Sequence, residues 1–539
     1  MTLPMGGVAS GKRVNVLRHS HVSVEWSQQK SLLSARSFGQ HCRSRRNRLV
    51  NQPISAGPTT ADRSTSHKAS ENHTTNTTQH RSNNGSTPSG ASNGVPGSKK
   101  IGPPLNESVQ AILLAGGPST NALARFRAMP AVKLGSNMQL IDVPISNCIK
   151  SGVNKMYVLT QFNSHTLNTH IAASYPPVVF GGPQKRGFVD VLTASQTPKS
   201  ANWYKGSADA VRQQLDSILD AFRGMDLPDE LLILSGQALY RMDYADLLQT
   251  HRSNNADITI ATHAVGLGQA SFRGCCKVEP DTGCISLFYE KPTGDDLDKV
   301  RSVSKNATEE NPFEASMGIY VFKRDVLVNL LRTESGDTKS AHFGADVIPH
   351  ALESKLKVVA HHFDGYWRDI SNLRDFFEVN LEMTSPGSPI SVFDVEETIV
   401  SRGHILPPAM IHKCEIVHSL MGEGSALRGS YIKGSVIGCN TFVANGCHIE
   451  DSLLMGNDNY SNDRERERAR QQGLSVLGIG ENSVIKRAII DDNVSIGSNV
   501  QIINKDGIEE ADHTKKGYVI QNGIVVILKG ATIPDGTVI

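Results

Sequence analysis

The stretch best suited to chemistry is an apolar run, Val109 to Ala115, that breaks into the loop Gly116-Gly-Pro-Ser-Thr120. Glycines at the end of a parallel strand let backbone N–H groups approach a polyphosphate, because no Cβ stands in the way. Nucleotides bind outside such strand ends in open α/β sheets. We therefore interpret Gly116 and Gly117 as part of a phosphate-cradling loop. An ordinary Gly-Pro turn would share this pattern, since a short glycine motif is a weak signal.

Eight further motifs follow this loop in one order along the chain. They are Asp142-Val-Pro-Ile-Ser-Asn-Cys148, Tyr157-Val-Leu-Thr-Gln-Phe-Asn-Ser164, Gly187-Phe-Val-Asp-Val-Leu192, Trp203-Tyr-Lys-Gly-Ser-Ala-Asp-Ala-Val-Arg-Gln213, Leu239-Tyr-Arg-Met-Asp-Tyr244, Glu290-Lys-Pro292, Ala315-Ser-Met-Gly-Ile-Tyr320 and Gly365-Tyr-Trp-Arg-Asp-Ile370. From about Glu107 to Ile539 the chain resembles ADP-glucose pyrophosphorylase (glucose-1-phosphate adenylyltransferase), most like its plant and algal starch-synthesis subunits. The resemblance implies ATP and glucose 1-phosphate as substrates and Mg²⁺ as cofactor.

On the sugar-phosphate side of the implied site, this chain has the residues that the resemblance leads us to expect. By resemblance, Lys291 holds the sugar phosphate, while Glu290 and Ser316 bond sugar hydroxyls. Tyr204 and Gly274 are expected to shape the same pocket. The alternative for Glu290 and Lys291 is a surface ion pair at a strand end, which would contribute about 0–1 kcal/mol.

The nucleotide side is implied by a second group of matches. Gly116, Gly117, Gln161 and Gly206 match positions that line the nucleotide. Asp369 matches one of two carboxylates expected to hold the metal ion.

The positions that carry catalysis depart from the family pattern. Asn121 stands where an arginine should face the triphosphate, and the segment Thr120–Arg127 is about two residues short. Met129 replaces a lysine, and Gln237 replaces the second metal carboxylate. Arg127 itself is retained and completes the catalytic candidates.

These replacements predict weak or absent turnover by the chain alone. A thioether carries no charge, and one amide oxygen cannot supply the negative charge that Mg²⁺ selects for. Each lost charged phosphate contact costs about 1.5–3 kcal/mol, enough to slow a reaction by orders of magnitude. The substitutions favour a large, regulatory-type subunit that relies on a catalytic small subunit over a fully active adenylyltransferase. A β-helix acyltransferase is a third alternative, but it would need a longer unbroken coil array and a catalytic His between coils.

Basic residues suggest an effector site. Arg127, Lys486, Arg487 and Lys529 match basic positions in regions where the family binds anionic sugar-phosphate effectors. Solvated surface lysines and arginines would give the same pattern.

The N-terminal region is basic and polar. Residues 1–50 hold nine Lys or Arg against the single acidic residue Glu25, a net charge of +8. This arginine-rich, acid-poor composition is typical of an organelle transit peptide, and the resemblance favours import into the plastid (chloroplast stroma) over a basic arm that touches nucleic acid. Residues 51–106 form a low-complexity segment; Asn51–Lys100 lacks aromatic residues, which predicts disorder.

Residues 107–384 alternate short aliphatic runs with amphipathic ones, which predicts an α/β domain with a doubly wound, mostly parallel, Rossmann-like sheet. Predicted strands are Ala111–Ala115, Met156–Thr160, Leu231–Leu234 and Ile258–Thr262, and Ser207–Phe222 is a predicted helix with Ser207 as its N-cap. After a linker over residues 385–410, residues 411–539 show aliphatic residues about six apart, the signature of a left-handed parallel β-helix. The charged stretch within Asn457–Gly473 is predicted to be a solvated loop or helix outside the coil.

Three further expectations concern surroundings and assembly. No apolar run approaches the 18 residues of a membrane span, so no membrane partner is expected. No nucleic-acid partner is expected either, because the basic leader is interpreted as a transit peptide. Eight cysteines show no metal-ligand spacing and are interpreted as mostly reduced, buried thiols. A short β-helix leaves apolar faces and coil edges that neighbouring subunits cover, which predicts a hetero-oligomer. The arrangement expected is a tetramer with two catalytic small subunits.

Overall fold

The computed structural model describes residues 105–539, apart from 118, 181–186, 195–202, 221–226, 302–307, 309, 334–340, 391–397, 402, 404, 460–461 and 473–474. The predicted leader, and the predicted low-complexity segment up to residue 104, lie outside the described residues. No helix in the described part is both long and apolar enough to cross a membrane.

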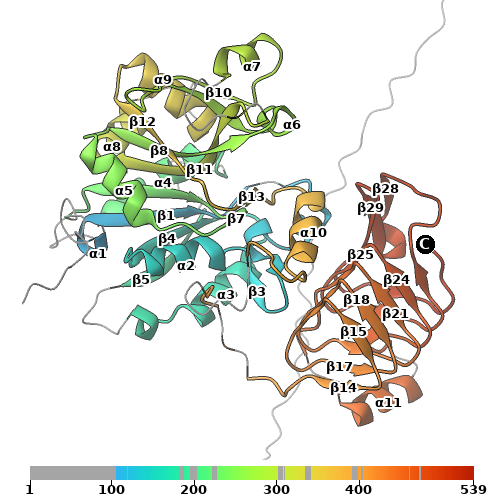
Figure 1. The fold of residues 1–539 in the computed structure, drawn as a ribbon. Coiled ribbons are helices and arrows are strands. Elements are labelled where there is room, and N and C mark those ends of the chain that lie inside the picture. The colour runs from blue at the N-terminus through green and yellow to red at the C-terminus, as the bar shows by residue number, and fades with distance from the viewer. Residues whose placement is uncertain are drawn as a thin grey trace, which may run out of the picture. The chain divides into compact units, whose positions relative to one another are not determined.

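The N-terminal part of the described chain is built on a nine-stranded sheet (Figure 1). Its strands are β1 (Val109–Leu114), β4 (Lys155–Thr160), β5 (Phe188–Thr193), β6 (Glu230–Ser235), β8 (Ile258–Val265), β9 (Gly274–Val278), β10 (Ile285–Glu290), β11 (Phe313–Lys323) and β12 (Val358–His362). The order is β10-β9-β11-β6-β1-β4-β5, with β8 between β11 and β12. Neighbours among β5, β4, β1 and β6 run parallel, whereas β11 is antiparallel to β6, β8 and β9.

Side-chain alternation explains why the central strands of this sheet are largely apolar. In β1, Ala111 and Leu113 point into one hydrophobic cluster, while Ile112 points into the other. Helices cover both clusters, so nearly every position of the central strands β1, β4 and β6 is buried, and a mostly apolar run results. On the first face lie α2 (Asp142–Lys150), α3 (His165–Ser174), α5 (Tyr244–Ser253) and α10 (Leu373–Glu382), and on the second α4 (Ser207–Asp220), α8 (Arg324–Thr333) and α9 (Ile348–Glu353).

Smaller elements complete this domain. They are α1 (Leu105–Ser108), α6 (Leu267–Ala270), α7 (Asp295–Val300), the short turns η1 (Ala122–Arg125), η2 (Met129–Ala131), η3 (Pro177–Phe180) and η5 (Phe343–Val347), and the pairs β2 (Lys133–Leu134) with β3 (Met138–Gln139) and β7 (Ala238–Tyr240) with β13 (Trp367–Asp369). The expected N-cap at the start of α4 is not formed by Ser207. Its hydroxyl instead accepts the backbone N–H of Phe343 at 3.1 Å, which ties η5 to the start of α4.

The C-terminal part of the described chain winds into a parallel β-helix with three faces (Figure 1). Its strands are β14 (Met410–His412), β15 (Glu415–Val417), β16 (Leu420–Met421), β17 (Ala426–Arg428), β18 (Tyr431–Lys433), β19 (Val436–Ile437), β20 (Phe442–Val443), β21 (His448–Glu450), β22 (Leu453–Leu454), β23 (Gly478–Ile479), β24 (Val484–Lys486), β25 (Ala488–Ile490), β26 (Ser495–Ile496), β27 (Gln501–Ile502), β28 (Ala511–His513), β29 (Tyr518–Gln521), β30 (Ile524–Ile527) and β31 (Thr532–Ile533), with a turn η6 (Thr514–Lys516). Ile432, Ile449 and Ile485 stack in register on one face. Each coil thus buries its aliphatic residues only against the next.

A helix, α11 (Asp463–Gln471), interrupts the coil between β22 and β23. The charged stretch there was expected to be solvated, but part of it packs on the coil. Arg466 is buried, with its guanidinium carbon 3.8 Å from the centre of the Phe442 ring, and Asp463 pairs with Arg428 at 2.7 Å. Alternating charges therefore serve docking as well as solvation.

The predicted linker over residues 385–410 is partly packed onto the first domain. The backbone N–H of Val400 donates to Ser146 at 2.8 Å, and its carbonyl accepts the Tyr175 hydroxyl at 2.8 Å. Ser401 donates its hydroxyl to the buried carboxylate of Asp142 at 2.7 Å. Seven cysteines lie in the described part; all are free thiols and five of them are buried.

Candidate functional site

The candidate site lies at the carboxyl ends of β1, β4 and β6, which are neighbours in the sheet. Gly116 lies just after β1, and it lies beside Gln161, the residue that comes after β4. A Cβ at position 116 would lie 3.0 Å from the Cβ of Gln161. Gly117 has φ +130°, a conformation that favours glycine. The loop glycines thus meet the geometric need of the phosphate-loop interpretation.

Gln161 connects the two sides of the site. Its amide Nε2 donates to the backbone carbonyl of Tyr204 at 3.4 Å, and the Tyr204 hydroxyl accepts a hydrogen bond from Gln214 at 2.8 Å. Gly206 lies against the carbonyl oxygen of Ala341 so closely that no side chain fits there. The structure therefore brings Gly116, Gln161 and Tyr204 together.

Glu290 lies in a cradle made by two glycines. A Cβ at Gly274 would lie 2.8 Å from its Oε2, and a Cβ at Gly344 would overlap that atom. Gly274 is also its partner in the β9–β10 ladder. The residue as a whole is exposed, yet the surroundings of its carboxylate raise its pKa through desolvation, against the opposing charges of Lys291 and His342.

Two further sugar-side residues lie near this cradle. Ser316, on β11, is buried and donates its hydroxyl to Tyr320 at 3.3 Å. Glu290 acts electrostatically on that same Tyr320. Lys291 is exposed, with φ +52°, and its backbone N–H donates to the carbonyl of Arg273 at 3.0 Å. The structure thus gathers the predicted sugar-phosphate residues in one region.

The nucleotide side is built differently, because Asn121 and Met129 face inward. Asn121 is 2 % exposed and its Oδ1 accepts the backbone N–H of Leu123 at 3.0 Å, capping η1. Met129 is 3 % exposed and belongs to the main hydrophobic cluster. Both were expected to mark positions facing the phosphates; in this chain they are packing and capping residues.

Arg127 was expected to be a catalytic residue and an effector ligand, and its position in the structure contradicts both expectations. Its guanidinium pairs with the carboxylates of Asp491 and Asp492 on the β-helix, and its Nε donates to the carbonyl of Leu123 at 3.2 Å. With 1 % of the residue exposed, it cannot reach a ligand. It is a buried anchor between the two domains.

Burial and the surrounding charges together shift the pKa values of the two carboxyl groups. Burial raises the pKa of Asp491 despite the nearby guanidinium. Burial also acts to raise the pKa of Asp492, but Lys133, Arg127 and Lys529 outweigh it and hold this pKa below its usual value. Lys133 lies 2.8 Å and Lys529 3.7 Å from the Asp492 carboxylate.

The shortened loop is also fastened to the β-helix. Gln521 on β29 accepts the backbone N–H of Ala122 at 3.1 Å and donates to the carbonyl of Thr120 at 3.3 Å. Arg125 pairs with Asp512 at 3.0 Å. A loop held at both ends by another domain has little freedom to wrap a triphosphate.

The positions assigned to the metal lie together but do not fit a divalent ion. Asp369 pairs with Ala238 across β7 and β13, and the backbone N–H of Ile370 donates to the carbonyl of Gln237 at 3.0 Å. Only one of the two positions is a carboxylate, and the guanidinium of Arg273 lies 3.9 Å from it. Within the described residues, no three His, Cys, Asp or Glu side chains are grouped to hold a metal. An amide, one carboxylate and a cation are a poor donor set for Mg²⁺.

Arg273 was not predicted from the sequence as a residue of the site. The only signal available was its place directly before Gly274, a predicted pocket residue. Its approach to Asp369 depends on the fold bringing the residue before β9 to β13, and these two segments lie far apart along the chain.

The predicted effector residues are dispersed. Lys529, with Lys133 and Asp492, lines a cavity of about 680 Å³ between the two domains. Lys486 and Arg487 are not among its lining residues; Lys486 pairs with Glu450 at 2.8 Å, and Arg487 occupies a turn with φ +48°. The structure thus keeps one of the four predicted effector residues at an open junction.

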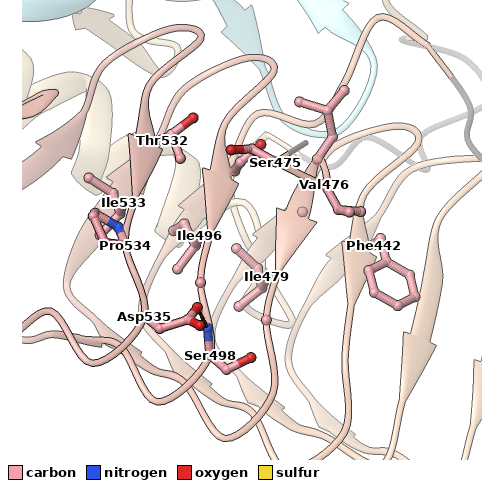
Figure 2. A pocket seen from close by; sticks show the side chains of 15 residues that line it. Phe442, Ser475, Val476, Ile479, Ile496, Ser498, Thr532, Ile533, Pro534 and Asp535 are labelled. Carbon is pink, nitrogen blue, oxygen red and sulfur yellow. Dashed lines mark hydrogen bonds between the residues drawn. The ribbon is translucent and has the colours of Figure 1, made fainter. Parts of the chain in front are cut away.

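A separate groove of about 510 Å³ runs along one face of the β-helix (Figure 2). Among the described residues that line it, Asp535 has the one charged side chain, and its carboxylate accepts the backbone N–H of Ser498 at 2.7 Å. Aliphatic and small residues such as Ile479, Ile496 and Thr532 make up most of the rest. The groove therefore offers no acid–base or nucleophilic set.

A doubly wound α/β sheet with a glycine loop at its carboxyl edge is the architecture of an enzyme that handles nucleotides. Residues 110–385 match the family model described as nucleotidyl transferase, and residues 404–538 match the GLGC left-handed parallel beta-helix domain. Because the first match covers more than half of the chain, the chain belongs to the nucleotidyl transferase family. The two domains in this order form the ADP-glucose pyrophosphorylase architecture, and the predicted fold class is confirmed.

Proposed function

We propose that the chain is a regulatory-type subunit of a glucose-1-phosphate adenylyltransferase in starch biosynthesis, which binds glucose 1-phosphate but depends on a catalytic small subunit for turnover. One contrast carries the proposal. The sugar side keeps Glu290 in its glycine cradle with Ser316 nearby. On the nucleotide side, by contrast, Asn121 caps a short helix, Met129 packs in the core and Arg127 is held in an ion pair.

The chemistry of adenylyl transfer explains why this contrast matters. Sugar binding is mostly hydrogen bonding in the ground state, which the kept residues supply. Rate comes from positive charge placed against the transition state, since the protein does little covalent work in such a transfer. Mg²⁺ would neutralise phosphate charge in the active enzyme, and in the proposed assembly the catalytic subunit holds it.

The decisive experiment measures binding and turnover separately. We expect the purified full chain to bind glucose 1-phosphate in calorimetry, and to form ADP-glucose at a useful rate only with its catalytic partner. Ser316→Ala should weaken binding, while Ser286→Ala, which removes an exposed hydroxyl of the same domain, should not. Robust ADP-glucose synthesis by the chain alone would overturn the proposal.

The proposed assembly is a hetero-oligomer, a tetramer with two catalytic subunits. It is supported by exposed apolar side chains at the first coil of the β-helix, where Met410 and Ile411 are each about half exposed. Light scattering of the co-expressed proteins tests it. A stable monomer with no retained partner would contradict it.

The proposed location is the plastid, supported by the basic, acid-poor composition of residues 1–50. The chain should be imported and cleaved somewhere before Glu107, and a reporter fused to residues 1–100 should enter plastids. Retention of the reporter in the cytosol would contradict this proposal.

A further inference from the structure

The inference concerns the two positions that would hold the metal, and it rests on the proposed function. Gln237 and Asp369 remain neighbours, because Asp369 at the end of β13 pairs with Ala238, the residue that follows Gln237. The backbone of a two-carboxylate site is therefore retained, while one of its charges is gone. Loss of a metal alone would leave Asp369 as an uncompensated carboxylate at the edge of the site.

Arg273 supplies the compensating charge. Its Nε lies 3.9 Å from Oδ2 of Asp369, and its guanidinium carbon lies 4.8 Å from the centre of the Trp367 ring. The side chain is only 11 % exposed. Within the described residues, the buried Nε has no hydrogen-bond partner. A desolvated N–H donor without an acceptor is costly unless a ligand completes it.

The same arginine borders the sugar-phosphate residues. Its backbone carbonyl accepts the N–H of Lys291, and the next residue, Gly274, forms the cradle of Glu290. A guanidinium presents several N–H donors in a planar fork that matches phosphate oxygens, and it cannot lose its charge at neutral pH. It therefore suits the task that a divalent ion performs on a phosphate.

We propose that Arg273 is the resident cation of this site: it takes the place of the divalent metal beside Asp369 and binds the phosphate of the sugar phosphate without Mg²⁺. A divalent ion placed beside Asp369 would be repelled by the nearby guanidinium, and a single carboxylate carries too little negative charge to offset that repulsion. The guanidinium thus excludes the metal as well as replacing it.

The first test probes metal binding with Mn²⁺ alone, read from the electron paramagnetic resonance of the free ion. The wild-type full chain should leave the Mn²⁺ signal unchanged. Gln237→Asp combined with Arg273→Gln should bind Mn²⁺ at least about tenfold more tightly than wild type. Gln237→Asp combined with Arg273→Lys keeps the positive charge and should behave like wild type. Mn²⁺ binding by wild type equal to that of the Gln237→Asp/Arg273→Gln chain would overturn the proposal.

The second test follows glucose 1-phosphate by calorimetry, in Mg²⁺ and in EDTA. Wild-type affinity should be the same in both, and Arg273→Gln should lower it about tenfold. Arg273→Lys, which keeps the charge without the fork, should bind with an affinity between those of wild type and Arg273→Gln. If Arg273→Gln fails to fold, Arg273→Lys is the test variant and should bind more weakly than wild type. The control, Arg332→Gln, removes an exposed arginine of the same domain and should change nothing. Loss of wild-type binding in EDTA would overturn the proposal.

The two tests separate the two hypotheses. If no variant binds glucose 1-phosphate, the binding half of the proposed function fails, while the Mn²⁺ comparison still decides whether Arg273 excludes a metal. If glucose 1-phosphate binds only with Mg²⁺, the proposed function stands and the assignment of Arg273 is wrong.

Discussion

The sugar side and the nucleotide side of the site share one sheet edge, yet their residues are held in different ways. On the sugar side, Glu290 stays open to solvent in a cradle whose shape depends on two glycines. On the nucleotide side, Asn121 and Met129 are buried, and Arg127 is bound within an ion pair. The comparison teaches that residues beside a candidate site can serve packing, capping and ion pairing in place of ligand contacts, because burial holds them away from the open part of the site.

The largest expected effect follows from breaking the Arg127 anchor. Arg127→Gln leaves Asp491 and Asp492 buried beside each other with less positive charge, and removal of one partner of a buried pair costs about 3–5 kcal/mol. Thermal unfolding should show the loss in free energy of unfolding. Arg125→Gln, which breaks a surface pair with Asp512, should cost less than about 1 kcal/mol. A stable Arg127→Gln chain would return Arg127 to the catalytic candidates.

Met129→Lys tests whether the nucleotide side can simply be restored. The new ammonium would lie within the main hydrophobic cluster, where burial of an unpaired charge costs about 3 kcal/mol. We expect lower stability in chemical denaturation, with the loss relieved at alkaline pH, because desolvation lowers the pKa of a buried lysine and the group is neutral there. Met129→Leu is the matched control and should cost less than about 1.5 kcal/mol. A fully stable Met129→Lys chain would indicate that position 129 opens into the site.

Gly344→Ala tests the cradle on the sugar side. A Cβ there would overlap Oε2 of Glu290, so the carboxylate must move, and we expect glucose 1-phosphate affinity to fall about tenfold, the equivalent of 1.4 kcal/mol. Calorimetry measures it. Gly268→Ala adds a Cβ that meets nothing within 4 Å, and it should leave affinity unchanged. Equal affinity of the two variants would show that the carboxylate position does not matter.

The raised pKa of Glu290 predicts a pH dependence. Because the folded pKa lies above that of a free glutamate, the cost of holding the charged carboxylate is present above the folded pKa and is relieved as the pH falls through it. Glucose 1-phosphate binding, which uses the ionised acceptor, should therefore weaken on acidification from a higher pH than a free glutamate would allow. Glu290→Gln should bind more weakly and lose this dependence; an unchanged pH profile would exclude Glu290 as the titrating group.

The smallest expected effect concerns the effector residues. Lys529 lines the cavity at the domain junction, whereas Lys486 pairs with Glu450 elsewhere on the β-helix. Lys529→Ala should weaken binding of an anionic sugar phosphate at this cavity by a few-fold, since one exposed charge contributes about 1 kcal/mol or less. Lys486→Ala should have no effect. Equal losses in both variants, measured by fluorescence titration, would contradict the dispersed arrangement.

Much of the fold followed from local pattern. The apolar runs at Ala111, Met156 and Leu231 became central strands, because a strand buried on both faces must be apolar at every position. The six-residue spacing of aliphatic residues likewise determined the β-helix, since each coil can bury its apolar side only against the next. The start of α4 was less predictable, because Ser207 bonds to Phe343 across the fold.

Within the site, the sequence alone determined which charges were present and which were missing, since Met129 and Gln237 cannot carry the charges of lysine and aspartate. Only the tertiary structure decided where the remaining charges act. Arg127 pairs with Asp491, more than 360 positions along the chain, and Arg273 approaches Asp369 through strands that are distant in sequence. Long-range contacts of this kind depend on how domains and strands meet in space, and a charged residue looks the same in the sequence whether it faces a phosphate or a buried carboxylate.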